Sequence, residues 1–278
     1  MPFNQPSRSD VHVDGPLSSV SVAYMQSADT FVADRAFPRL GVSKQSDVYF
    51  TYDRGYFNRA EMKKRAPSTE SAGATYAIST DSYLADVWAL HRDIADQVRA
   101  NADSPIKLDT EAAEFLTLQG LLRREKEWAD AHFVTGAWTS EVTGVSDHPD
   151  IVGRLDRGQT SGPAIVLRDA LAALFELSEI LVMDAIENTA NEGATNVHAF
   201  IGGKHALLLY TPATPGLMTP SAGYTFTWTG LLGGGALGTR ISRMRVELRK
   251  ADRVEIEMAF DQKQVAADLG YFFLTAVS

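Results

Sequence analysis

The sequence predicts an α+β fold, in which helices and strands follow one another without a regular strand–helix–strand period. Residues 109–135 have the apolar spacing of one long helix. Residues 47–53 alternate as a strand does, and residues 240–260 contain two further strand-like runs. An internal repeat of about 20 to 50 residues is not visible. These observations favour a mixed architecture organised around the long helix.

The composition narrows the classes of protein to be considered. The 278 residues, 45% of them apolar and 22% charged, are enough for one large domain or two smaller ones. The absence of cysteine excludes a disulfide framework and a thiolate metal site, and it fits a reducing compartment. No apolar run approaches the roughly 18 residues of a membrane span, and no signal-peptide pattern opens the sequence. The net charge of −9 gives no overall attraction to nucleic acid, although a local face remains free to contact it.

The long helix is predicted to begin at Asp109, whose side chain suits an N-cap. Glu111 and Glu114 follow in its first turn, where negative charge is favourable. The residues predicted to face the core are Phe115, Leu118, Leu122, Ala129 and Phe133, and those predicted to face water are Arg123, Arg124, Glu127 and Asp130. At about 1.5 Å per residue the helix spans roughly 40 Å. It is therefore expected to act as a strut to which the flanking segments attach.

The first ~30 residues are polar, and prolines interrupt them at Pro2, Pro6 and Pro16. They predict either a flexible tail or an extended arm that becomes ordered only against a neighbouring subunit. Residues 28–37 have a pattern that allows a short amphipathic helix before Pro38.

Residues 44–85 predict a hairpin that cannot stabilise itself. A strand at 47–53 places Val48, Phe50 and Tyr52 on one side, and a second strand is predicted at 75–79 after a long polar connection. Because an isolated two-stranded hairpin is marginal in water, it must pack on its own domain or on another subunit. The connection is locally basic through Arg54, Arg59, Lys63, Lys64 and Arg65. It is either a solvated loop or a basic tongue that meets an acidic neighbour.

Further elements are predicted along the rest of the chain. An amphipathic helix is predicted at 83–99, a turn-rich segment at 136–163 and a second helix at 164–177. A buried strand follows at 179–187, and then a hairpin at 198–212 with its turn at Gly202–Gly203. The last segments are an aromatic and then glycine-rich one at 223–238, two strands at 240–248 and 253–260 about a turn at 250–252, and an apolar stretch at 264–277 that closes a sheet.

Residues 233–238 match the glycine pattern of dinucleotide-binding loops, and Glu255 follows at about the expected distance. That fingerprint needs a strand before the glycines and a helix after them, whose N-terminus meets the pyrophosphate. The residues that follow do not form a helix face and end in a strand-like run. The sequence therefore favours a glycine-rich loop over a nucleotide site.

No other pattern predicts a catalytic or metal site. The histidines are His12, His91, His132, His148, His198 and His205. His198 and His205 flank the predicted Gly-Gly turn, but two facing histidines are more often an accidental pair than a metal site. The acidic pairs Glu111/Glu114 and Glu255/Glu257 lie where helix and strand surfaces account for them. No catalytic, cofactor-binding or metal-binding residue is predicted.

Several long blocks, taken in order, resemble the major capsid proteins of tailed bacteriophages. In the first half they are FVADRAFPRLGVSKQSDVYFTYD, RAPSTESAGATYAISTDSY, RANADSP with KLD, and FLTLQGLLRREKEWADAHFVTGAW. In the second half they are HPDIVGRL, GKHALLLYTPATPGLMTPSAGYTFTWTG and DRVEIEMAFDQKQVAADLGYFF. The resemblance covers residues 30–278 and is specific, because the blocks are long and keep their order.

The resemblance implies the HK97-type capsid fold, with an N-terminal arm, an extended two-stranded E-loop, a peripheral P domain with a long spine helix, and an axial A domain. The implied boundaries are 1–43 for the arm, 44–85 for the E-loop, 86–139 for the P domain with its spine helix at 109–135, 140–240 for the A domain, and 241–278 for the closing P-domain strands. Between Trp138 and His148 the family usually has several tens of residues more. Either the A domain is shortened near 143–147, or residues are missing from the chain as given.

The implied role is structural and not enzymatic: a subunit that assembles with copies of itself into the hexamers and pentamers of an icosahedral phage head around double-stranded DNA. Implied partners are a portal and scaffolding or decoration proteins, with DNA contacted non-specifically and no membrane. The implied location is the virion capsid, after assembly in the cytoplasm of a bacterial host.

Two alternatives stay open. An encapsulin-type bacterial compartment shares the fold and encloses cargo protein, although the RAPSTESAG and PGLMTPSAGYTF blocks favour a phage protein. A nucleotide-binding enzyme that uses the glycines at 233–238 belongs to another class.

Overall fold

The structure is a computed structural model, and it describes residues 26–102, 106–143, 171–212, 214–216, 219–232 and 238–276. Some sequence predictions fall outside these ranges. They concern most of the N-terminal arm, the site of the expected A-domain shortening, the first half of the helix at 164–177, most of the glycine loop, and His12 and His148.

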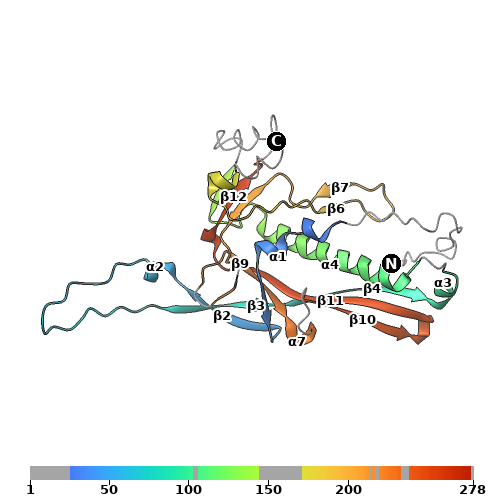
Figure 1. Cartoon of the computed structure of the whole chain (residues 1–278), viewed down its shortest axis with the longest axis horizontal. Helices are drawn as coiled ribbons and strands as arrows, with labels where there is room; N and C mark the ends of the chain where they lie inside the picture. The colour runs from blue at the N-terminus through green and yellow to red at the C-terminus, as the bar shows by residue number, and fades with distance from the viewer. Residues whose placement is uncertain are drawn as a thin grey trace.

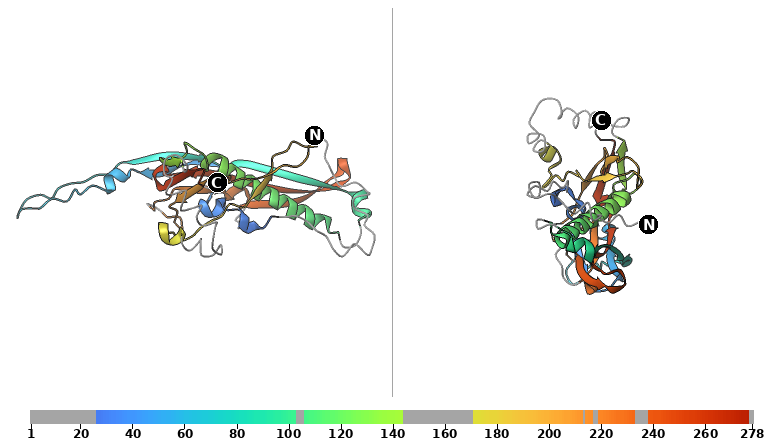
Figure 2. Two further views of the ribbon diagram at one scale, coloured as in Figure 1. Left: turned by 90° about the horizontal axis from the view of Figure 1, so that it is seen from above. Right: turned by 90° about the vertical axis from the view of Figure 1, so that its right-hand side faces the viewer.

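The described part of the chain is elongated (Figure 1 and Figure 2). A hairpin of β2 (Ser46–Tyr52) and β3 (Ile78–Leu84) projects from one end. The turn between β10 (Thr239–Val246) and β11 (Ala251–Gln264) lies at the opposite end. The long helix α4 (Leu108–His132) runs between them over 25 residues, or about 38 Å. It is the strut predicted from the sequence.

Strand β11 is the centre of the main sheet. It pairs antiparallel with β4 (Asp86–Ala95) on one side, and on the other side first with β10 and then with β9 (Gly223–Trp228). β1 (Arg39–Val42) pairs parallel with β9 at the edge of the sheet. Alternate side chains of β11 are buried, namely Val254, Ile256, Met258 and Phe260. They give the sheet one apolar face, which packs against α4.

Gly120 allows α4 to lie close to this sheet. A Cβ at this position would lie 3.0 Å from the Sδ atom of Met258 and 3.4 Å from Cδ1 of Ile256. A larger residue would push the helix and sheet apart. The close approach explains a glycine in the middle of a helix, where it costs roughly 1 kcal/mol relative to alanine.

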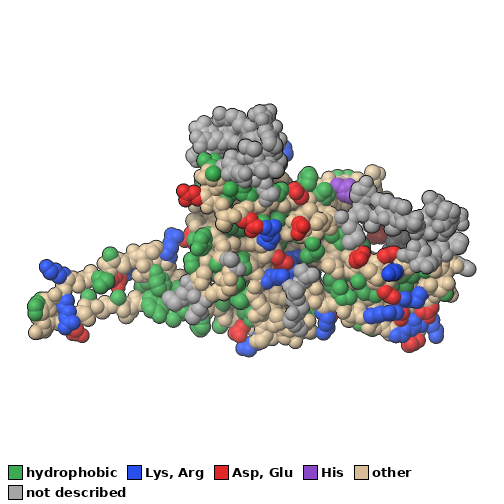
Figure 3. Space-filling model, in the orientation of Figure 1, with side chains coloured by type: hydrophobic (Ala, Val, Ile, Leu, Met, Phe, Trp, Pro, Cys, Tyr) green, Lys and Arg blue, Asp and Glu red, His purple; other side chains and the backbone are tan. Residues whose placement is uncertain are grey.

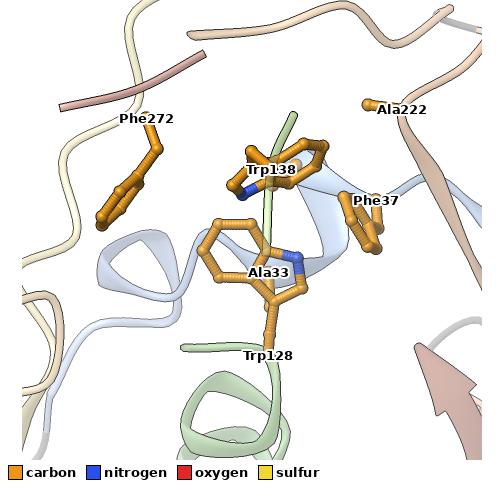
Figure 4. Packing of buried hydrophobic residues seen from close by; sticks show 7 residues of the cluster. Ala33, Phe37, Trp128, Trp138, Ala222 and Phe272 are labelled. Carbon is orange, nitrogen blue, oxygen red and sulfur yellow. The ribbon is translucent and has the colours of Figure 1, made fainter. Parts of the chain in front are cut away.

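A second core forms where the C-terminal half of α4 meets α1 (Ala33–Ala36) and the C-terminal sheet. Its residues converge from distant parts of the sequence: Ala33, Ala36, Phe37, Trp128, Trp138, Ala222 and Phe272 (Figure 4). Phe37 is fully buried and meets Trp128 edge-on, with 5.7 Å between ring centroids. The indole N–H of Trp138 donates to the carbonyl of His132, so its polar atom is satisfied.

Smaller elements complete the fold. β12 (Gly270–Leu274) pairs parallel with β5 (Ser140–Thr143) and antiparallel with β8 (Ala206–Leu209). β6 (Ile186–Asn188) and β7 (His198–Phe200) form a separate pair. The remaining helical segments are α2 (Arg54–Phe57), α3 (Asp96–Ala100), α7 (Thr229–Leu232), residues 171–175, and 3₁₀ turns at Ala28–Thr30, Glu247–Arg249 and Ala267–Leu269.

The predicted start and buried face of the long helix need correction. The N-cap position is Lys107, and Asp109 lies in the first turn, where its carboxylate accepts two hydrogen bonds from Arg99. Phe115 is 46% exposed, whereas Arg124 is only 2% exposed. The guanidinium of Arg124 is buried because the carboxylate of Asp34 and the ring of Phe260 meet it. Neither partner is close to it in the sequence.

Residues 83–99 do not form the predicted helix. They contain the end of β3, the whole of β4 and the start of α3. The apolar residues of this segment fit both the helical period and the strand period, because Trp88, Leu90 and Ile94 also lie on one face of a strand. Pairing with β11 along all ten residues of β4 decides between them. A local pattern cannot reveal that distant partner.

Two other predicted strand arrangements are wrong. In the segment 179–187 only the last two residues enter a strand, and Val182 is 49% exposed. Residues 198–212 are not a hairpin about the Gly-Gly turn, because β7 pairs with β6 and β8 pairs with β12. His198 and His205 therefore belong to different parts of the fold. Short apolar runs match several partners equally well, so the local sequence does not specify the pairing.

Several other predicted elements are confirmed with shifted boundaries. β2 covers the strand expected at 47–53, and β10 with β11 forms the expected antiparallel pair, although their turn lies at 247–250. The second hairpin strand begins at Ile78 instead of Thr75. The helix expected at 28–37 is divided into a 3₁₀ turn and α1, and the C-terminal stretch closes a sheet as β12.

Candidate assembly surfaces

The β2–β3 hairpin extends well beyond the rest of the chain (Figure 1). The strands pair from Ser46–Leu84 at the base to Tyr52–Ile78, and residues 53–77 connect them with a single helical turn, α2. Most residues of the connection are exposed. Such an extension buries little surface of its own.

One face of the hairpin is apolar and bare. Cross-strand register places Val48, Phe50, Ile78 and Leu84 on the same face. These side chains are 56%, 61%, 52% and 54% exposed, respectively. Hydrophobic side chains gather visibly where the hairpin meets the body (Figure 3). An apolar strip of this kind, on a segment that projects from the body, indicates a surface that another molecule covers.

The opposite face fixes the hairpin to the body. Tyr49 and Tyr83 lie on that face and pack against Phe226 of β9, with ring centroids 5.3 and 4.6 Å apart. The hydroxyl of Tyr49 donates to Asp81 at 2.8 Å, and burial, with this hydrogen bond, raises the pKa of Tyr49. The hairpin therefore leaves the body in a defined direction with its apolar face outward.

The far part of the hairpin has its own aromatic cluster. Tyr52, Phe57 and Tyr76 have ring centroids 5.7 to 6.2 Å apart. Beyond them Met62 is fully exposed, and the basic run Lys63–Arg65 is exposed beside it. Arg54 differs from the other predicted basic residues, because it forms a 2.7 Å ion pair with Asp268 of its own chain.

The opposite end of the molecule carries a network of ion pairs, visible as mixed red and blue side chains in Figure 3. Its members are Arg99, Arg243, Arg245, Arg249 and Arg253, with Asp93, Asp96, Asp109 and Asp252. The arginine hydrogen bonds hold the pKa values of these four aspartates below their usual range. The network ties the β10–β11 turn to β4, α3 and the start of α4.

The segment that leads into α1 is bound by two adjacent residues of α4. Both carboxylate oxygens of Glu125 accept hydrogen bonds from the backbone of Val32 at 3.0 Å, and Oε2 also accepts from Ala33 at 2.8 Å. Arg124 pairs with Asp34 at 2.8 Å. Burial raises the pKa of Glu125, and the two backbone N–H groups oppose that rise. No feature of the local sequence pointed to Glu125.

The residues that a catalytic interpretation singled out do not converge. His132 is buried and its Nε2 lies 2.9 Å from the carbonyl of Gln262, whereas His205 packs between Phe133 and Phe272.

Gly238 is followed directly by strand β10, so the helix that the nucleotide fingerprint needs does not follow the glycines. Within the described ranges, no group of three or more potential ligands is arranged for a metal ion, and no helix is both long and apolar enough to cross a membrane.

Comparison with known proteins agrees with this geometry. The chain is 24% identical to the major capsid protein of Pseudomonas phage JBD67, over 96% of this chain and 97% of that one. No family model matches. The structure resembles a phage-related protein from Bordetella bronchiseptica RB50, with a TM-score of 0.60 and 18% identity over 95% of this chain and 97% of the other.

Two shell proteins also share the arrangement. The capsid structure of cyanophage P-SCSP1u gives a TM-score of 0.53 at 9% identity, over 97% of this chain and 94% of that one. The chain has the fold of capsid proteins. The SrpI encapsulin of Synechococcus elongatus PCC 7942 has the same fold, with a TM-score of 0.52 and 11% identity over 92% and 91% of the two chains. The resemblance to phage major capsid proteins seen in the sequence is thereby confirmed.

Proposed function

We propose that this protein is the major capsid protein of a tailed phage. It is a structural, non-catalytic subunit that assembles with copies of itself into the hexamers and pentamers of an icosahedral shell around double-stranded DNA. The observation that carries the proposal is the bare apolar face of the projecting hairpin, which a subunit acting alone has no reason to expose. The similarity in sequence to a phage major capsid protein supports it.

The hairpin supplies one contact between copies. Its apolar face lies on a neighbouring subunit, and Lys63, Lys64 and Arg65 at its far end meet acidic groups there. A chain with a net charge of −9 offers such groups on every copy. Because this contact joins different surfaces of the two partners, it is heterologous, and such a contact forms rings when the rotation between successive copies closes.

We assign the parts of the chain as the family resemblance implies. The arm is 1–43, the E-loop is 44–85, the P domain with α4 as its spine is 86–139, the A domain is 140–240 and the closing strands are 241–278. The alignment with the phage JBD67 protein runs over 309 residues, more than the 278 of this chain, so the relative has residues that this chain lacks. That difference fits both a shortened A domain and residues missing from this chain. Portal and scaffolding or decoration proteins complete the particle. The protein is located in the capsid of the virion.

An encapsulin-type shell is the second candidate, and the fold shared with the SrpI encapsulin favours it. The two candidates differ in what the particle contains. A phage head encloses DNA, whereas a compartment of the encapsulin type encloses protein. The nucleotide-binding enzyme is a third candidate, which the strand that directly follows Gly238 disfavours.

Size-exclusion chromatography followed by negative-stain electron microscopy of the purified protein tests the proposal. Closed shells, or free hexamers and pentamers, are the expected result, and nuclease and protease treatment of the contents distinguishes a phage head from a compartment. A monodisperse monomer or dimer whose melting temperature rises with NAD or ATP would contradict the proposal and support the nucleotide enzyme.

A further inference from the structure

The N-terminal half of α4 carries an apolar strip that is only partly covered. Phe115, Leu118 and Leu122, here called the α4 strip, follow one another at helical spacing and share one side of the helix. Phe115 is 46% exposed, and the two leucines are partly buried. Leu90 of β4 lies on the same face of the sheet as α4, because it is paired with Ile256, and it is 44% exposed. A contiguous apolar surface of this kind indicates a binding site.

The described chain begins beside one end of the α4 strip. The side-chain amide of Gln26 donates to the carbonyl of Ile186 at 2.7 Å and accepts from the backbone N–H of the same residue at 2.7 Å. The next residue of β6, Glu187, pairs with Lys126 of α4 at 2.8 Å, and β6 lies along the helix (Figure 1). Lys126 follows Leu122 by one helical turn on the same side. Gln26 is therefore held near the Leu122 end of the strip.

The sequence that precedes Gln26 has the length and the chemistry to cover the strip. It contains 25 residues, which lie outside the described ranges. Its last part alternates, with Val20, Val22 and Tyr24 at the period of an extended chain, so one edge of that chain is apolar. These three residues span about 13 Å when extended, and the α4 strip spans about 11 Å. The C-terminal half of α4 is already bound by the segment that leads into α1, so the open apolar surface lies toward the start of the helix.

We propose that residues 20–24 bind in an extended conformation along the α4 strip of their own chain, with their apolar edge against it. Only Met25 separates Tyr24 from the anchored Gln26. So short a tether gives the segment an effective concentration in the millimolar range at its own helix, an advantage that a neighbouring copy lacks. The inference goes beyond the proposed function, because both surfaces belong to one chain and their contact does not require assembly.

The absence of cysteine from the chain allows a direct test in the unassembled subunit. Val22→Cys combined with Leu118→Cys introduces the only two thiols, and a disulfide forms only where two Cα atoms come within about 7 Å. After mild oxidation we expect a monomer without free thiols that migrates faster on a non-reducing gel. Val22→Cys combined with Thr117→Cys is the matched control. Position 117 adjoins the strip but points about 100° away around the helix, so this pair is expected to keep its thiols free.

The same thiols distinguish the chain's own segment from that of a neighbour. The two single variants, Val22→Cys and Leu118→Cys, are mixed in equal amounts and oxidised together. We expect no dimer in which positions 22 and 118 are linked, as determined by mass spectrometry of the peptides. Such a dimer would overturn the proposal in favour of a second copy. A double variant that keeps both thiols free would overturn it as well, because the strip is then open to other partners.

A second measurement uses Tyr24 as a cleavage site for chymotrypsin and needs no cysteine. Phe115→Ser removes the most exposed residue of the strip, so cleavage after Tyr24 is expected to become about tenfold faster than in the wild type. Phe50→Ser, on the hairpin, is the control and should leave this rate unchanged. Equal rates in Phe115→Ser and the wild type would overturn the docking. Wild-type protein that forms no particles but gives the 22–118 disulfide in the double variant would contradict the proposed function alone and support the docking.

Discussion

Two aromatic regions of this molecule have opposite environments. In the core beneath α4, Phe37 is fully buried among Trp128, Trp138 and Phe272. On the hairpin, Phe50 is 61% exposed. The first region stabilises the subunit by itself. The second contributes to stability only when another surface covers it, so its residues are explained by assembly and not by folding.

The polar groups of the two regions differ in the same way. Glu125 is buried, and its carboxylate accepts hydrogen bonds from backbone N–H groups of the same chain. Lys63 and Lys64 are exposed on the hairpin connection. The comparison predicts that substitutions in the core change the free energy of unfolding, whereas substitutions on the hairpin change assembly and leave unfolding nearly unaffected.

The largest effect on stability is expected from Phe37→Ala. Truncation of a fully buried aromatic side chain leaves a cavity and costs about 3–5 kcal/mol. Urea unfolding of the unassembled subunit measures this cost. The matched control is Phe50→Ala, for which we expect a change within about 0.5 kcal/mol. Similar losses for both variants would remove the distinction between the two regions.

The next effect is expected from Glu125→Ala. It leaves the N–H groups of Val32 and Ala33 buried without their acceptor, which costs about 1–3 kcal/mol. Glu125→Gln keeps one acceptor oxygen and is expected to lose less. If the alanine and glutamine variants unfold at the wild-type urea concentration, the carboxylate does not bind the arm.

A pH dependence is expected from His132. Burial lowers its pKa below the ordinary 6.5, so the folded subunit binds the proton less tightly than the unfolded chain does. Stability from this group is complete above about pH 6.5 and falls as the pH drops below that value. The melting temperature between about pH 7.5 and pH 5.5 should therefore fall more for the wild type than for His132→Gln. Parallel profiles for the two proteins would exclude a role for this histidine.

Smaller effects on stability, with a large effect on assembly, are expected from Phe50→Asp combined with Ile78→Asp. Both residues lie on the bare face, where charge opposes burial against a neighbour. Ser79→Asp lies on the other face of the same strand and is the control. Electron microscopy should find particles for the control and none for the double variant. Normal particles from the double variant would place the contact elsewhere.

The smallest effect on unfolding is expected from reversing Lys63, Lys64 and Arg65 to Glu. These side chains are exposed, so the subunit should remain folded. Assembly is expected to be impaired because the hairpin then repels an acidic neighbour. A charge-preserving triple variant, Lys63→Arg, Lys64→Arg and Arg65→Lys, serves as control. Normal yields of particles from the glutamate variant would refute the electrostatic part of the contact.

The sequence predicted the elements whose own pattern specifies them. Strand β2 alternates clearly, and the structure places Val48 and Phe50 on one face as predicted. The long helix was predicted from its spacing, but its buried face was predicted only in part. Ala129 is buried as expected, whereas Arg124 and Glu125 are buried by partners about 90 residues away. Strand β4 was missed for the same reason, since its partner β11 lies near the C-terminus.

The most direct test of the central claim is hydrogen exchange of the hairpin before and after assembly. Amides of β2 and β3 should exchange more slowly in particles than in free subunits, because a neighbouring copy covers the bare face. Amides in the middle of α4 should exchange at similar rates in both states, since the core is complete in one chain. Equal exchange of the hairpin in particles and in free subunits would contradict the account.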